Sequence, residues 1–304
     1  MRPPPPLRWT AAARARLADA AEHRGGPFVL EGRKLVLDAL RAGRVRVREL
    51  WVAEGLGAAA DALLDAAAAA GVPVGRVPDA AIERTSDTVT PQGVLALADD
   101  PAVPAETVLA AAAGPLVLLD GVQDPGNVGA ILRTAAAFRF AGALVGAGSA
   151  DPVGPKALRA SAGAALAVPF ARGPVDALLA AVAASRRPVW LLDGDGASIF
   201  STRLPAAAPV LAVGSEGRGA SEAVRRAAAA RVAIPISPAV ESLNAAVAFG
   251  VVAAHLVGGR VAPSAPAAPA AGPPGPPHRP SPPRGSDAPR TPDRGRTRPR
   301  RPAP

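Results

Sequence analysis

The chain has 304 residues, a net charge of +9, no Cys and only three His, and 49% of its residues are apolar. Without cysteine the protein has no disulfide and no thiolate metal site, and three widely separated histidines argue against a His-based metal site and a Ser-His-Asp triad. The N-terminal sequence lacks a secretory signal, and the longest apolar run, 243–259, is shorter than the roughly 20 residues of a membrane span. We therefore expect a cytoplasmic protein with no membrane segment and no metal.

The N-terminal third predicts a small α/β domain. Residues 1–26 are Pro-rich and then form a short Ala/Arg helix, and we interpret them as an extension because ordered structure is expected from about Phe28. Apolar periodicity then predicts helices and extended segments in alternation: helices at 33–42 and 58–70, extended segments at 45–52, 72–77 and 94–98. This places a compact α/β domain over 27–99. Pro101 and Pro104 indicate a linker, assigned to 100–114.

Residues 115–259 repeat a strand-then-helix pattern. Short apolar strands are predicted at 116–119, 143–145, 189–192, 210–213 and 232–236. Helices are predicted at 128–138, 175–184, 221–229 and 243–257. Wholly apolar strands joined by helices indicate a parallel sheet covered on both faces. Ligands bind such sheets beyond the carboxyl ends of the strands.

The tail, 260–304, differs in composition from the rest of the chain. It holds fifteen Pro, nine Arg and two Asp, for a net charge of +7, and almost no large apolar residue. Such a segment cannot bury enough surface to offset its ordering entropy, so we predict disorder. Two interpretations stay open, a solubilising extension and an arginine-rich arm that raises RNA affinity without sequence specificity.

The first polar segment after a predicted strand is DGVQDPGNVGAILRTA, 120–135. Asn127 stands where a helix N-cap is expected. Gly129 and Arg133 are four residues apart, so they share a helix face, and the glycine leaves room for a phosphate or ribose beside the guanidinium. The plainer alternative is a capped helix with a solvent-facing arginine.

Two further segments follow later strands. GSEGRG, 214–219, is a Gly-rich loop with Glu216 at its centre, although a lone loop of this kind is more often a turn than a site. It is neither a P-loop nor a dinucleotide fingerprint. IPISPAVESLN, 234–244, leads into a helix that begins near Ser242, which is expected to be its N-cap. Asn244 is harder to explain structurally, because a polar side chain in an apolar helix needs partners if it is buried.

In order, spacing and position, NVGAILRTAAAF, GSEGRG and IPISPAVESLN resemble the three-motif signature of the SpoU (TrmH-like) RNA 2′-O-ribose methyltransferases of the SPOUT superfamily. The resemblance covers about 116–256. FVLEGRKLVLDAL and VTPQGVLAL resemble the small substrate-binding domain that precedes the catalytic domain in this family. The implied fold class is α/β, a parallel sheet covered by helices and ending in a C-terminal trefoil knot, after a small α/β RNA-binding domain.

The resemblance also implies the cofactor, the partners and the site. The cofactor is S-adenosyl-L-methionine, and the protein is a homodimer that acts on structured RNA, for which we favour rRNA over tRNA. The implied cofactor-binding residues are Gly214, Glu216, Ile234 and Leu243. The implied catalytic residues are Arg133, with Asn127, Glu216, Ser242 and Asn244 as supports. Because a guanidinium stays protonated, we favour a phosphate anchor for Arg133 that also stabilises the developing alkoxide.

One position departs from the family pattern, and two alternatives remain. Ala246 stands where many relatives have a second serine, which puts a secondary contact in doubt. The first alternative is a nucleotide-binding α/β enzyme, although DGVQDPGN is a poor phosphate loop. The second is a non-catalytic RNA-binding protein of the same fold, against which the intact polar motif residues argue.

Overall fold

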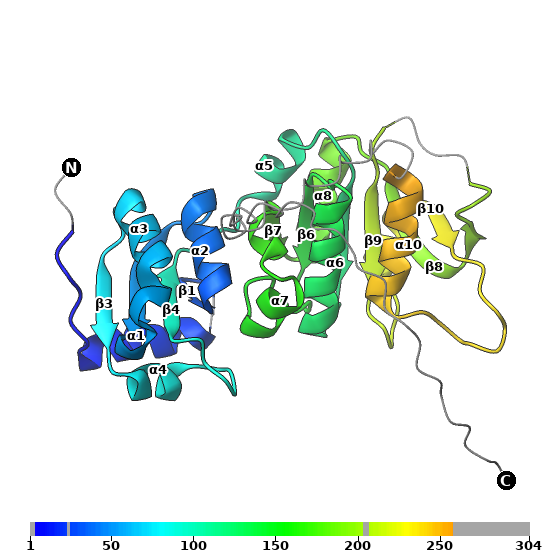
Figure 1. Ribbon diagram of the computed structural model, residues 1–304. Helices are drawn as coiled ribbons and strands as arrows, with labels where there is room; N and C mark the ends of the chain where they lie inside the picture. Colours follow the sequence, from blue (N-terminus) through cyan, green and yellow to red (C-terminus); the bar gives the residue numbers. More distant parts are fainter. Residues whose placement is uncertain (1–3, 23–24, 203–206, 258–304) are drawn as a thin grey trace, which may run out of the picture. The chain divides into compact units, whose positions relative to one another are not determined.

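The computed structural model describes residues 4–22, 25–202 and 207–257 (Figure 1). The predicted tail, 260–304, lies outside the described residues. Strands form two sheets, one of four strands and one of six, as expected for two α/β domains. Within the described ranges, no helix is long and apolar enough to cross a membrane.

The first domain is built on the four-stranded sheet, whose strand order is β1-β4-β2-β3. Its strands are β1 (Phe28–Glu31), β2 (Val47–Ala53), β3 (Val74–Val77) and β4 (Val94–Ala98). Its helices are α1 (Ala11–Glu22), α2 (Arg33–Ala42), α3 (Asp61–Ala70) and α4 (Asp79–Thr85), with a 3₁₀ segment at Glu54–Ala60. β4 pairs antiparallel with β1 and β2, whereas β2 and β3 are parallel. The separate α/β domain is confirmed, with β1 and α4 as additional elements.

Ordered structure begins well before Phe28, so the expectation of an N-terminal extension over 1–26 is wrong for most of that range. The buried residues of α1 are spaced about one turn apart: Ala13, Leu17 and Ala20. They pack in one apolar cluster with Trp51 of β2. Ahead of the helix, the Leu7 backbone N–H donates to the Val74 carbonyl at 2.9 Å. An Ala-rich helix can therefore bury a narrow stripe and join the domain.

The second domain is built on the six-stranded sheet, in the order β10-β8-β9-β5-β6-β7, and every pairing is parallel. Its strands are β5 (Leu116–Asp120), β6 (Gly142–Gly146), β7 (Phe170–Gly173), β8 (Val189–Ser198), β9 (Val210–Gly214) and β10 (Ala228–Ala233). Its helices are α5 (Ala105–Ala110), α6 (Pro125–Ala137), α7 (Pro155–Ala160), α8 (Val175–Ala184), α9 (Glu222–Ala227) and α10 (Ala245–Val257), with a 3₁₀ turn at Ala164–Leu166. This confirms the predicted parallel sheet.

Helices cover both faces of this sheet, which explains why its central strands are apolar throughout. Val117 and Leu119 of β5 belong to the core that includes α6 and α10, whereas Leu116 and Leu118 belong to the core of α5, α8 and α9. The assignment of a linker to 100–114 is too long, because α5 begins at Ala105 and buries its apolar side chains in the second core.

The strands β8 and β9 part at the edge where a ligand is expected. They are paired only over Val189–Leu191, while β9 stays paired with β5 as far as Gly214. β10 ends at Ala233, earlier than the predicted strand 232–236, so Ile234 lies in the loop that follows. The separation leaves an opening beyond the carboxyl ends of β8, β9 and β10.

Candidate functional site

A cavity of about 370 Å³ lies in this opening. Its walls come from the ends of the three strands and from the loops after β9 and β10. Five of the predicted site residues line it: Gly214, Glu216, Ile234, Ser242 and Leu243. Apolar residues such as Val213 and Ile234 line it together with polar residues such as Ser215 and Glu216, which suits a flat heterocycle with a polar edge.

Hydrogen bonds join the three polar segments beside this cavity. The Asn127 Nδ2 donates to Glu216 Oε1 at 2.5 Å, and the Asn244 Nδ2 donates to Asn127 Oδ1 at 2.9 Å. The partners are 89 and 117 residues apart in the chain. The structure therefore brings Asn127, Glu216 and Asn244 together, and Asn127 is the central member.

Asn127 is not the N-cap of its helix, contrary to the sequence prediction. Asp124 is the cap, since its carboxylate accepts from the Gly126 N–H at 3.1 Å and Pro125 occupies the first turn. The Gly126 N–H and the Lys156 ammonium hold the pKa of Asp124 below its ordinary value. With a proline and a cap ahead of it, Asn127 lies in the first turn and its amide is available to Glu216.

Asn244, and not Ser242, caps α10. The Asn244 Oδ1 accepts from the backbone N–H of Ala246 at 2.9 Å and of Val247 at 3.2 Å. Its amide nitrogen remains for Asn127, so one side chain begins the helix and orients the site. Ser242 is exposed at the cavity wall.

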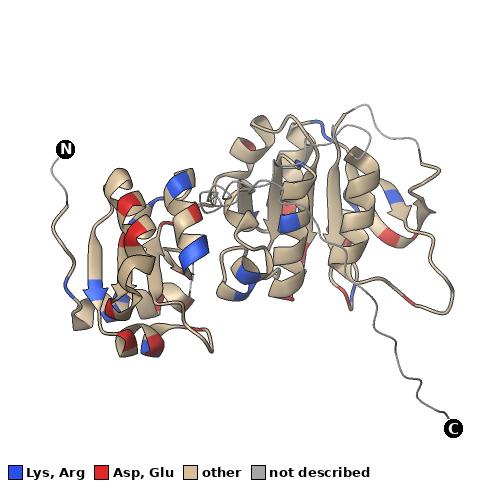
Figure 2. Ribbon diagram, in the orientation of Figure 1, with Lys and Arg blue, Asp and Glu red and all other residues tan. Residues whose placement is uncertain are grey.

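Gly129 does not leave room for a ligand. A Cβ at this position would lie 2.4 Å from the Ala157 carbonyl oxygen and 2.7 Å from the Ala160 Cβ. The glycine therefore lets α7 pack closely on α6. Arg133, the one charged residue of α6 (blue in Figure 2), is exposed and has no ion-pair partner among residues 4–22, 25–202 and 207–257. It lies outside the lining of the cavity.

The loop 214–219 is a tight hairpin. The Ser215 and Gly219 backbones exchange two hydrogen bonds, of 3.0 and 2.8 Å, and Gly219 has a φ of +67°. A Cβ on Gly214 would lie 2.4 Å from the Ala220 backbone nitrogen. The close approach of the Ala220 backbone therefore requires a glycine at position 214, independently of any ligand contact. The hairpin also carries Glu216.

We expect Gly214→Ala to lower the free energy of unfolding by about 2–3 kcal/mol, because the added methyl group would force the backbone of Ala220 to move. The matched control is Gly217→Ala in the same hairpin, where a Cβ meets nothing within 4 Å. Urea denaturation of the two variants measures the difference. Equal stability of the two would show that the close approach at Gly214 is not a constraint.

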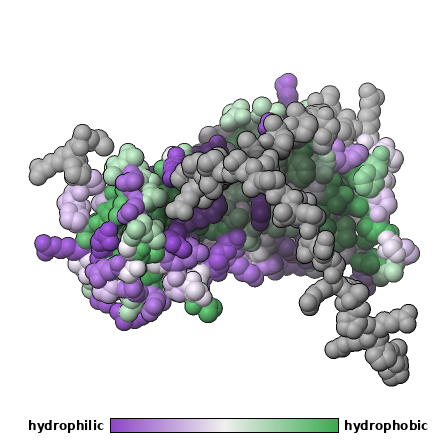
Figure 3. All heavy atoms as spheres, viewed as in Figure 1, coloured by the Kyte–Doolittle hydropathy of each residue, from purple (hydrophilic) through white to green (hydrophobic). Residues whose placement is uncertain are grey.

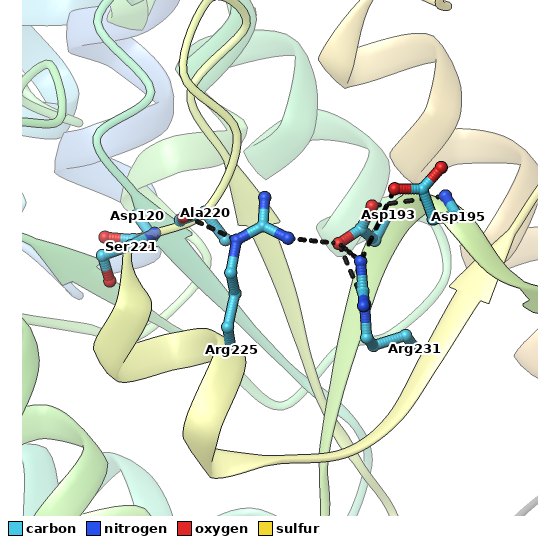
Figure 4. A network of polar contacts seen from close by, with 7 residues as sticks. All are labelled: Asp120, Asp193, Asp195, Ala220, Ser221, Arg225 and Arg231. Atoms are coloured by element: carbon cyan, nitrogen blue, oxygen red, sulfur yellow. Dashed lines mark hydrogen bonds and ion pairs between the residues drawn. The ribbon is translucent and has the colours of Figure 1, made fainter.

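Among the cavity residues that were not singled out from the sequence are Asp193 and Arg225 (Figure 4). Asp193 follows the apolar run of β8, which is the position where ligand-binding residues of parallel sheets occur, so the sequence contained a signal for it. Its Oδ2 accepts from Arg225 at 2.9 Å and from Arg231 at 2.6 Å. Burial opposes ionisation of Asp193, but the hydrogen bond and charge of Arg231 outweigh it and lower the pKa of this carboxyl.

Buried Asp120 extends this polar cluster towards the hairpin. At the end of β5, its Oδ2 accepts from the Ser221 N–H at 2.5 Å, and the Ser221 hydroxyl caps α9. Arg225, one turn into α9, also donates to the Ala220 carbonyl at 3.2 Å. Within the described part of the chain, no group of three or more His, Cys, Asp or Glu side chains is arranged to hold a metal ion.

Comparison with known proteins agrees with this architecture. The model of the SpoU rRNA Methylase family matches residues 114–254, and a model described as RNA 2′-O ribose methyltransferase substrate binding matches 29–104. A protein of Mycolicibacterium paratuberculosis, named an uncharacterized tRNA/rRNA methyltransferase, is 39% identical over 236 residues, which are 74% of this chain and 75% of the relative.

Solved structures match over most of the chain. A TrmH-family protein from Porphyromonas gingivalis has a TM-score of 0.72 and 34% identity, covering 82% of this chain and 98% of the other. An AdoMet-bound rRNA methyltransferase from Sinorhizobium meliloti has a TM-score of 0.74 and 25% identity, with 84% and 98% covered.

Proposed function

The chain belongs to the SpoU rRNA methylase family, and on this premise we propose that it methylates a ribose 2′-hydroxyl of structured RNA with S-adenosylmethionine as the methyl donor. The observation that carries the proposal is the hydrogen-bonded chain of Glu216, Asn127 and Asn244, which ties all three polar segments to one cavity. The match of 29–104 to a substrate-binding model for RNA 2′-O-ribose methyltransferases supports the ribose as the acceptor.

The cavity fits the cofactor. Its volume of about 370 Å³ lies in the range of small-molecule sites, and apolar walls at Ile234 and Leu243 suit an adenine ring. The carboxylates of Glu216 and Asp193 face it, which suits a ligand that carries a sulfonium and an ammonium. Gly214, Glu216, Ile234 and Leu243 would hold the cofactor, which supplies an activated methyl group when bound.

The protein residues have separable tasks in this reaction. Asn127 and Asn244 fix Glu216 against the cavity, which orders the loops before any ligand arrives. Arg133 has no ion-pair partner within the described ranges, so its guanidinium is available for an RNA phosphate next to the reacting ribose. As a permanent cation it also stabilises negative charge that develops on the 2′-oxygen. Ser242 supports the site from the cavity wall.

We further infer that two copies act together. Because Arg133 is not part of the cavity lining of its own chain, its guanidinium would act on the reacting ribose at the cavity of a second copy. Six large apolar side chains are exposed within the described residues. Five of them lie in the loop before α10, in α10 itself or against that helix: Phe200, Ile236, Val240, Leu243 and Val247. Apolar side chains also gather around α10 in the space-filling view (Figure 3). Such a patch is typical of a dimer interface.

Val247→Glu is expected to convert the dimer into a monomer, because it would place a charge within this patch, where Val247 is 53% exposed. Sedimentation velocity at micromolar concentration measures the change. The matched control is Val89→Glu in the first domain, also at an exposed valine, which should leave the dimer intact. A dimeric Val247→Glu variant would contradict this assignment of the interface.

Three finer features belong to the same proposal. We favour rRNA over tRNA as the substrate, because a separate first domain is frequent in rRNA-directed relatives. The loop after β10 takes part in a trefoil knot, and the enzyme works in the cytoplasm. The membership in this family is the support for these features.

A labelled-methyl transfer assay on total RNA tests the function. We expect incorporation at a single 2′-O-methyl position, located by mapping RNA from a strain that lacks the gene. Cofactor binding by calorimetry without methyl transfer to any RNA would favour a non-catalytic RNA-binding protein. Failure to bind S-adenosylmethionine would favour a different nucleotide ligand.

A further inference from the structure

We propose that Asp193 binds the ribose hydroxyls of the cofactor's adenosine, with Arg225 and Arg231 holding its carboxylate in place. The inference deepens the proposed function and rests on it, because it assigns one part of the cavity to one part of S-adenosylmethionine. The sugar of a nucleoside offers two adjacent hydroxyl donors, and a carboxylate is their usual acceptor in α/β proteins.

The position of Asp193 in the sheet is the first argument. β8 and β9 are paired only as far as Leu191, and Asp193 is the first charged residue of β8 beyond that point. It lines the cavity together with Gly194, Val213 and Gly214. Its side chain is only 12% exposed, so the carboxylate lies at the base of the opening and not at its rim.

The hydrogen bonds of Asp193 are the second argument. Both arginines approach the same oxygen: Arg225 at 2.9 Å and Arg231 at 2.6 and 3.1 Å donate to Oδ2 (Figure 4). The other oxygen, Oδ1, accepts a long bond of 3.3 Å from the Asp195 N–H. A carboxylate oxygen has two lone pairs, so Oδ1 retains capacity for a hydroxyl donor.

The two arginines explain why a charge is kept at this place. They come from different elements, α9 and β10, so the carboxylate is oriented from two sides and stays ionised despite its burial. Arg225 is also tied to the Ala220 carbonyl beside the hairpin. The acceptor is therefore rigid before the ligand binds, which lowers the entropic cost of binding.

The test is a cycle of protein and ligand changes, measured by calorimetry with S-adenosylhomocysteine and its 2′-deoxy and 3′-deoxy analogues. For the wild-type protein we expect a dissociation constant that is ten- to hundredfold larger for at least one deoxy analogue than for the parent ligand. This is the usual effect of losing a hydrogen bond to a charged group. Asp193→Asn should weaken binding of the parent ligand by a similar factor, and should bind that analogue with little further loss.

The control variant is Asp195→Asn, two residues further along β8. The Asp195 carboxylate is 92% exposed, and its ion pair with Arg231 is long, at 3.9 Å. It should bind all three ligands like the wild type. Equal wild-type affinity for the parent and both deoxy analogues would overturn the proposal, and so would an equal penalty for deoxygenation in Asp193→Asn and the wild type. Absence of any binding by the wild-type protein would instead contradict the proposed function. Because the wild-type arm needs no variant, a folding defect in Asp193→Asn leaves the test intact.

Discussion

Arg133→Ala is expected to lower the rate of methyl transfer by about a hundred- to thousandfold, the usual effect of removing one group that stabilises developing charge. The variant should unfold at the same temperature and bind S-adenosylmethionine with the same affinity, because Arg133 is exposed and lies outside the cavity. Thermal unfolding, calorimetry and single-turnover methylation of the mapped RNA measure the three properties separately.

The control is Arg226→Ala, which removes another exposed arginine of the same domain; its ion pair within the described residues is with Glu222 of its own helix. It should retain full activity. A loss of cofactor binding in Arg133→Ala at unchanged stability would show that Arg133 serves the cofactor and not the RNA. Mixing Arg133→Ala with Glu216→Gln should restore part of the activity if Arg133 completes the cavity of the partner subunit, since one intact composite site then forms per mixed dimer.

Asn127→Asp is expected to reduce methyl transfer by about a hundredfold and cofactor affinity by about tenfold, because the hydrogen bond that positions Glu216 in a preorganised site would be lost. The side-chain amide that donates to Glu216 would be replaced by a carboxylate, so two negative charges would face each other over the present 2.5 Å contact. The first turn of a helix tolerates a negative charge well, so the fold should remain stable.

A double-mutant cycle between Asn127→Ala and Asn244→Ala separates the network from its members. If the two side chains act as one unit through their 2.9 Å hydrogen bond, the double variant should be no worse than the more damaging single variant. The loss of transfer rate is the measurement, with thermal unfolding to account for the cap of α10. Fully additive losses would mean that the residues act independently.

Secondary structure in the catalytic domain followed from local pattern. The runs at 116–119 and 210–213 are apolar at every position, and both are central strands buried on two faces. The helix α8, which is apolar along most of its length, was predicted at its observed bounds. Elements with weak patterns were missed or misjudged. The Ala-rich α1 buries only two alanines and one leucine, so its sequence differs little from that of an exposed alanine helix, and its packing depends on Trp51 of the neighbouring strand.

The sequence by itself singled out the polar residues of the candidate site, because Asn127, Arg133, Glu216 and Asn244 stand out from apolar surroundings in a characteristic order. What each does was decided by tertiary contacts. Gly129 allows α7 to pack closely on α6, and Gly214 allows the hairpin to fold back on itself. Asn244 caps α10 and also donates a hydrogen bond to Asn127 in the candidate site. Asp193 gains its importance only where β8 leaves β9 and two arginines meet its carboxylate. Local sequence encodes propensity and burial, whereas hydrogen bonds between residues about a hundred positions apart depend on how the strands are ordered in the sheet.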